Sequence, residues 1–78
     1  MLTRHPEQTM QLSARNVLAG RVTKVTHGAV ESEIVIQLSP GVEIVSTITK
    51  SSAERMNLKP GDQAHAIIKA SNVIVGVD

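Results

Sequence analysis

The stretch "AVESEIVIQLSPGVEIVSTIT", residues 29–49, decides the fold of this chain. Its first half alternates between two faces, and one of these faces carries Val30, Ser32, Ile34 and Ile36. A period of two is typical of a β-strand, and "SPG" at 39–41 is typical of a turn. The second half is rich in β-branched side chains, which favour strands. The stretch predicts a hairpin of strands 29–38 and 42–49, and the apolar run "IVI" predicts that the first strand is covered on both faces.

Upstream of the hairpin, residues 17–25 also alternate and predict a strand. Gly20 within it marks a place where another segment approaches closely, since glycine is otherwise unfavourable inside a strand. The following "THGAV" predicts a tight turn into the hairpin. Residues 1–9 show no periodicity and contain Pro6, so we interpret them as a flexible leader to a domain at 10–78.

Downstream of the hairpin, the sequence changes to a helical pattern. Ser51 and Glu54 have capping-box spacing, and a short helix is closed by Ala53, Met56 and Asn57. After the turn "LKPGD", residues 63–69 and 72–77 predict two more short strands. The predicted fold is all-β, a five-stranded Greek-key barrel of the OB type with one short helix between strands 3 and 4.

Composition limits the class of protein. The 78 residues fit one small domain, and a core without Phe, Tyr or Trp buries less apolar area per residue than an aromatic one. The chain has no Cys for disulfides, so a monomer would be marginally stable and self-association is expected. We find no signal peptide and no apolar run long enough for a membrane span, which predicts a cytoplasmic protein.

Five motifs, in order and spacing, together resemble one known family. They are "SARN" at 13–16, Gly20 with Val22, "GAVESEIVI" at 28–36, "STITKSSAERMNLKPGD" at 46–62 and "IIKASNVIV" at 67–75. This combination resembles the Mop domain of molbindins, small cytoplasmic proteins that bind molybdate and tungstate. The resemblance covers residues 10–78. It implies storage or homeostasis of these oxyanions, with no cofactor and no covalent chemistry.

A buried tetrahedral dianion needs several hydrogen-bond donors and little nearby negative charge. Three segments offer such donors, and their residues are Ser13, Ala14 and Arg15, then Thr49 and Ser52, then Lys69, Ala70 and Ser71. The resemblance implies that the oxyanion lies between subunits. In that arrangement one chain supplies the first and third segments, and another supplies the second.

The resemblance further implies a homo-oligomer, namely a hexamer built as a trimer of dimers. It places a second anion site near the threefold axis, at His27, Gly28, Ala29 and Val30. Symmetry would bring three copies of these backbone amides around one anion. The neighbouring Glu31 and Glu33 would repel an anion if they pointed inward, and His27 is also a natural turn residue.

Ordinary structural roles compete with these assignments. Ser51 and Ser52 precede a helical pattern and are typical helix caps. Arg15 is also typical of a surface ion pair, and Lys69 of a solvated turn. We interpret Asn16 as structural, because a short amide at a loop-to-strand joint readily satisfies local backbone groups.

Other functional classes find little support in the sequence. No nucleophile stands with a base, and no Gly-rich phosphate loop is present, so an enzyme is not expected. Nucleic-acid binding by an OB-type barrel relies on aromatic stacking in a basic groove, whereas this chain has no aromatics and a net charge of +1. His5 and His65 lack the spacing of a zinc site. An oxyanion-sensing module of a molybdate transporter or repressor remains the alternative function.

Overall fold

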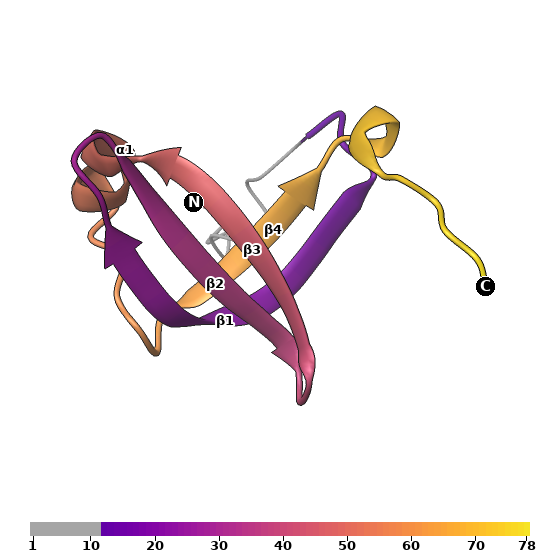
Figure 1. The fold of residues 1–78 in the computed structure, drawn as a ribbon, viewed down its shortest axis with the longest axis horizontal. Coiled ribbons are helices and arrows are strands. Elements are labelled where there is room, and N and C mark those ends of the chain that lie inside the picture. Colours follow the sequence, from indigo (N-terminus) through magenta and orange to yellow (C-terminus); the bar gives the residue numbers. More distant parts are fainter. Residues whose placement is uncertain (1–11) are drawn as a thin grey trace, which may run out of the picture.

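A computed structural model describes residues 12–78. Four strands form one antiparallel sheet in the order β3-β2-β1-β4, and the sheet curls into a half-barrel (Figure 1). The strands are β1 (Asn16–His27), β2 (Glu31–Ser39), β3 (Val42–Thr49) and β4 (Gln63–Ile68). The predicted leader at 1–9 lies outside the described residues. No helix within residues 12–78 is long and apolar enough to cross a membrane.

The predicted hairpin is confirmed as β2 and β3. The residue pair Val35 and Val45 lies at its centre, and Gly41 takes φ of 79° in the connecting turn, a left-handed conformation that favours glycine. Strand β2 begins two residues later than predicted because Gly28 N–H donates to Glu31 O at 2.7 Å and closes the preceding turn. The alternating pattern therefore predicts correctly which strands pair, while the turn determines the residue at which β2 begins.

Strand β1 is the long central element that joins the two halves of the sheet. Its first half pairs with β4, its second half pairs with β2, and the register shifts between Val22 and Lys24. At Gly20 a Cβ atom would lie 2.6 Å from Gln37 O and 2.6 Å from Ile36 Cγ2. The close approach predicted at Gly20 is confirmed, and the neighbouring strand β2 causes it.

Helix α1 (Lys50–Arg55) follows β3 directly. The capping box predicted at Ser51 is wrong, because Thr49 is the N-cap and its Oγ1 accepts from Ser52 N–H at 3.1 Å. Lys50 N–H also donates to Val30 O at 2.7 Å, which turns the chain out of the strand earlier than the local pattern indicates. The helix ends as expected, with Asn57 in a left-handed conformation.

The core is small and aliphatic. Its buried members are Val22, Ile34, Ile36, Ala53 and Ala66, against which six partly buried apolar residues pack. The five buried residues come from β1, β2, α1 and β4, so the helix covers one end of the curled sheet. On the opposite face of β2, Val35 is only half-buried, so the predicted two-sided covering is incomplete within one chain.

The predicted fifth strand at 72–77 is wrong for the single chain. A 3₁₀ turn, η2 (Ala70–Asn72), follows β4, and its bonds include Asn72 N–H to Lys69 O at 2.8 Å. The turn directs the chain away from the sheet (Figure 1), so no strand of the described residues pairs with 73–77. Ile74 and Val77 are each 93% exposed as a result. One chain forms a four-stranded half-barrel instead of a five-stranded barrel.

Candidate functional site

Two of the three predicted donor segments meet at one end of the sheet. Asn16 opens β1 and pairs with Ile68, which closes β4, so residues 13–15 and 69–71 leave the same end of one strand pair. Neither segment contains an acidic residue, whereas Arg15 and Lys69 are cationic and exposed. This end of the molecule therefore combines two positive charges, two serine hydroxyls and backbone amides.

Each of these segments is held by hydrogen bonds at its base. The side chain of Asn16 donates from Nδ2 to Ile68 O at 3.2 Å, across the strand pair. The bonds of η2 order the segment that follows β4, since Val73 N–H donates to Ala70 O at 3.2 Å. The interpretation of Asn16 as structural agrees with this bond to a backbone group, but the group is not local, because Ile68 lies 52 residues away in sequence.

The third segment, with Thr49 and Ser52, forms a hydroxyl pair at the start of α1. Thr49 Oγ1 donates to Ser52 Oγ at 2.8 Å while it accepts from Ser52 N–H. The Thr49 hydroxyl is thus engaged within the pair and also lies 3.4 Å from Ser51 Oγ, whereas the Ser52 hydroxyl hydrogen is left for donation to another group. The arrangement leaves one hydroxyl donor, that of Ser52, beside the start of a helix.

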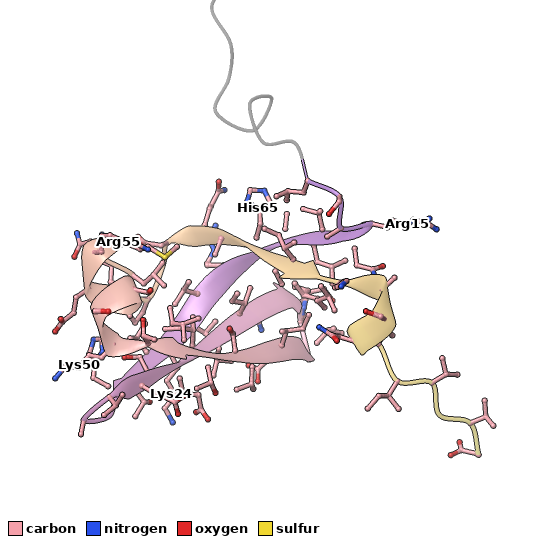
Figure 2. The ribbon with its side chains drawn as sticks, turned by 90° about the horizontal axis from the view of Figure 1, so that it is seen from above. Arg15, Lys24, Lys50, Arg55 and His65 are labelled. Atoms are coloured by element: carbon pink, nitrogen blue, oxygen red, sulfur yellow. The ribbon has the colours of Figure 1, made fainter. Side chains whose placement is uncertain are left out.

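The third segment lies at the opposite end of the molecule from the first two. Figure 1 shows α1 and η2 on opposite sides of the curled sheet. Figure 2 shows Arg15 at one end of the ribbon, with Lys50 and Arg55 of α1 at the other. One chain therefore brings six of the eight predicted residues to one end and leaves Thr49 and Ser52 apart from them.

The turn predicted as a second anion site already uses part of its hydrogen-bonding capacity. His27 Nδ1 and Ser32 Oγ are 2.7 Å apart, and Gly28 N–H is bonded to Glu31 O. A shallow pocket of about 330 Å³ here is also lined by Glu31 and Glu33. The negative charge of both carboxylates repels an anion, so the turn offers a weaker site than the strand ends.

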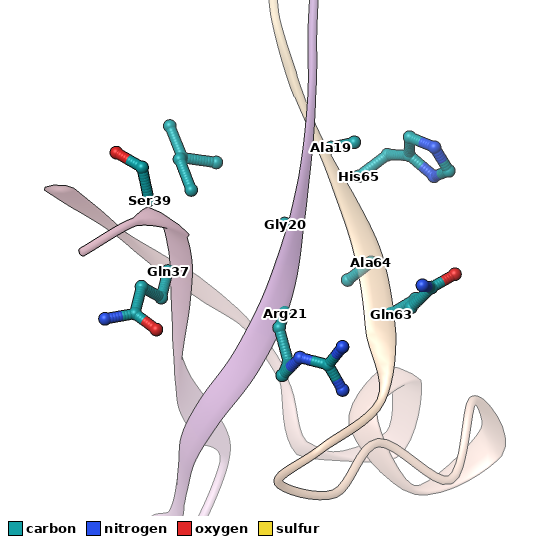
Figure 3. Close-up of a pocket in the computed structure, with 9 residues that line it drawn as sticks. Ala19, Gly20, Arg21, Gln37, Ser39, Gln63, Ala64 and His65 are labelled. Atoms are coloured by element: carbon teal, nitrogen blue, oxygen red, sulfur yellow. The ribbon is translucent and has the colours of Figure 1, made fainter.

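A further cleft of about 370 Å³ lies over the middle of β1 (Figure 3). Its polar side chains do not converge on a common point, since Gln37 points to one side of β1 whereas Arg21 and His65 point to the other (Figure 3). Arg21 Nη1 is also bonded to Gly61 O at 2.9 Å. No sequence motif indicated this cleft, and its geometry gathers no donors. Among residues 12–78, no group of His, Asp or Glu is arranged to hold a metal ion.

Comparisons with known proteins identify the family to which this fold belongs. The family model described as "TOBE domain" matches residues 12–75. A "probable molybdenum-pterin-binding protein" of Haemophilus influenzae is 39% identical over 69 residues, which cover 88% of this chain and all of that protein. A solved molybdate-binding protein from Sporomusa ovata is 35% identical with a TM-score of 0.81, covering 87% of this chain and 100% of that one.

A second solved structure is that of ModG, described as a cytoplasmic molybdate-binding protein, with molybdate bound. It is 47% identical with a TM-score of 0.86, and the match covers 92% of this chain and 51% of ModG, so the chain spans about half of that protein. Fold and relatives together define a small β-domain from a class of binding proteins. The chain belongs to the TOBE domain family, in its molbindin (Mop) group.

Proposed function

We propose that this protein binds molybdate, and tungstate, as intact oxyanions in the cytoplasm and serves in their storage and homeostasis. The observation that carries the proposal is the pairing of Asn16 with Ile68. This pairing brings together the segments of Arg15 and Lys69, neither of which contains an acidic residue. The molybdate-binding relatives described above support the same ligand.

The chemistry of these segments suits a tetrahedral dianion. Ser13 and Ser71 provide hydroxyls, the backbone at 14, 15 and 70 provides N–H groups, and Arg15 and Lys69 provide charge. Hydrogen bonds to charged groups contribute about 1.5–3 kcal/mol each. Several such bonds offset the cost of removing the dianion from water. The exposure of Arg15 and Lys69 in one chain leaves the site open on one side.

On this proposal, a second copy of the chain closes the site with Thr49 and Ser52. Because these residues lie at the far end of the same chain, an antiparallel arrangement of two copies would form two equivalent sites. The Ser52 hydroxyl is then the donor that the partner contributes. We further propose that such dimers assemble into a hexamer.

The second copy would also complete the core. An open cavity of about 380 Å³ lies between the two sheet edges, β3 and β4, and is lined mostly by apolar side chains such as Ile36, Ile48 and Ile67. The segment 73–77 is extended at Val73 and exposes apolar side chains to solvent. We infer that this segment of one copy enters the cavity of another as the fifth strand of its barrel. An extended apolar segment and an open apolar groove complement each other in shape and polarity.

Titration calorimetry with molybdate, tungstate, sulfate and phosphate, together with the mass of the assembly, tests the function. We expect tight binding of the two larger oxyanions, weak binding of the smaller two, and a homo-oligomer. A stable monomer that binds molybdate would contradict the two-chain site. An oligomer that binds none of the four anions would contradict the function itself.

A further inference from the structure

One side chain joins the two donor segments to each other. Asn16 Nδ2 donates to Ile68 O at 3.2 Å, and the two residues are the last pair of the β1 and β4 ladder. Beyond this pair the two segments of the chain continue separately, one toward Arg15 and the other toward Lys69. The bond therefore sits at the fork from which both donor segments extend.

The bond also fixes the orientation of a peptide group. The carbonyl of Ile68 and the N–H of Lys69 belong to one planar trans peptide, so they point in opposite directions. When Asn16 holds the carbonyl oxygen, it fixes the direction of the Lys69 N–H and of the chain that enters η2. The start of η2 then carries this orientation to residues 70 and 71.

The exposure of the residues around the fork makes this bond important. Arg15, Lys69 and Ser71 are all exposed, so no packing against the core holds them in place. Asn16 and Ile68, by contrast, are partly buried and belong to the sheet. Asn16 is therefore the described side chain that ties the exposed donor segments to the partly buried end of the sheet.

We propose that Asn16 is a positioning residue that sets the distance between the two donor segments and so selects the larger oxyanions over sulfate. The inference rests on the proposed oxyanion-binding function. Molybdate and sulfate carry the same charge, so donor spacing is the property that separates them. When the two segments are held at a fixed separation, their donors stay spaced for the larger molybdate. When the Asn16 bond is lost, the donors can move closer together and bind the smaller sulfate.

The test compares Asn16→Ala and Asn16→Ser with a matched control. The control is Thr23→Ala, which also removes a side-chain hydrogen bond from β1 to a neighbouring strand. This bond runs from Thr23 Oγ1 to Val35 O at 3.4 Å and lies in the middle of the sheet, away from the donor segments. Calorimetric titration gives the affinities for molybdate and sulfate. Since one hydrogen bond contributes about 0.5–1.5 kcal/mol, we expect both Asn16 variants to bind molybdate about two- to tenfold more weakly.

Sulfate affinity should stay within about twofold of the original protein or rise, so the molybdate-to-sulfate ratio narrows. Thr23→Ala should keep the ratio unchanged. Hydrogen exchange gives a second readout, in which the Lys69 and Ala70 amides exchange faster in both Asn16 variants. An equal loss for both anions, or an unchanged ratio, would show that Asn16 only stabilises the fold. If the unaltered protein binds no molybdate, the proposed function fails instead.

Discussion

The fifth-strand proposal makes a prediction about single residues in the exposed segment 73–77. In an extended segment Val73, Val75 and Val77 share one face, while Ile74 lies on the other with Gly76 and Asp78. The valine face is the more uniformly apolar, so we expect it to enter the partner's cavity. Val75 is 84% exposed in the single chain, which leaves nearly its whole side chain to be buried on assembly.

Val75→Ala removes two methyl groups from this face, at about 0.8 kcal/mol each, or roughly 1.5 kcal/mol per segment. A dimer contains two exchanged segments, so its dissociation free energy falls by about 3 kcal/mol and its dissociation constant rises by a factor on the order of 150. Sedimentation over a series of protein concentrations measures this change. Ile74→Ala is the matched control, since Ile74 is 93% exposed and lies on the other face.

We expect a much smaller shift for the control. Equal effects of Val75→Ala and Ile74→Ala would refute the strand-like insertion, because an inserted strand buries its two faces unequally. Unchanged assembly in both variants would refute the role of the segment altogether.

Three further predictions concern the site and the sheet. The Thr49→Ala and Lys69→Ala variants should each bind molybdate weakly. When the two variants exchange subunits, about a quarter of the sites should regain full affinity, because random pairing of a two-chain site leaves that fraction with both original residues. Calorimetry that finds no recovery would place all donors on one chain. Ser13→Ala should narrow the molybdate-to-sulfate ratio in competition titrations, whereas Lys69→Ala should weaken both dianions alike. Gly20→Ala should destabilise the fold by about 1–3 kcal/mol in urea unfolding, because its Cβ would meet a backbone oxygen at 2.6 Å.

Local sequence patterns predicted those parts of the fold that local interactions determine. Strand β3 has the predicted bounds because its β-branched residues follow a turn with a left-handed glycine. The start of α1 was predicted incorrectly because the bond from Lys50 N–H to Val30 O joins residues far apart in sequence. The strand pattern at 72–77 is real, but a strand also needs a partner edge, and η2 directs this segment away from both edges of its own sheet.

The candidate site also has a part that the sequence could predict and a part that it could not. Composition and motifs could identify Ser13, Arg15, Lys69 and Ser71 as donors, and the family resemblance assigned their role. The pairing that brings them together, Asn16 with Ile68, spans 52 residues and leaves no local signal. Only the topology of the sheet, with β4 beside the first half of β1, reveals that the two segments leave the same end.

The incomplete core and the incomplete site have one cause on this proposal. The half-barrel buries five apolar residues and leaves a largely apolar cavity between its edges. Its donor segments at one end lack the hydroxyl pair that lies at the other end. A second copy supplies both missing parts, so any ligand that binds only the assembled form stabilises assembly and fold together. At about 100 times its dissociation constant, such a ligand adds roughly 2.7 kcal/mol per site, which is a large share of the stability of a domain this small. Oxyanion binding in this protein is therefore expected to be inseparable from its oligomeric state.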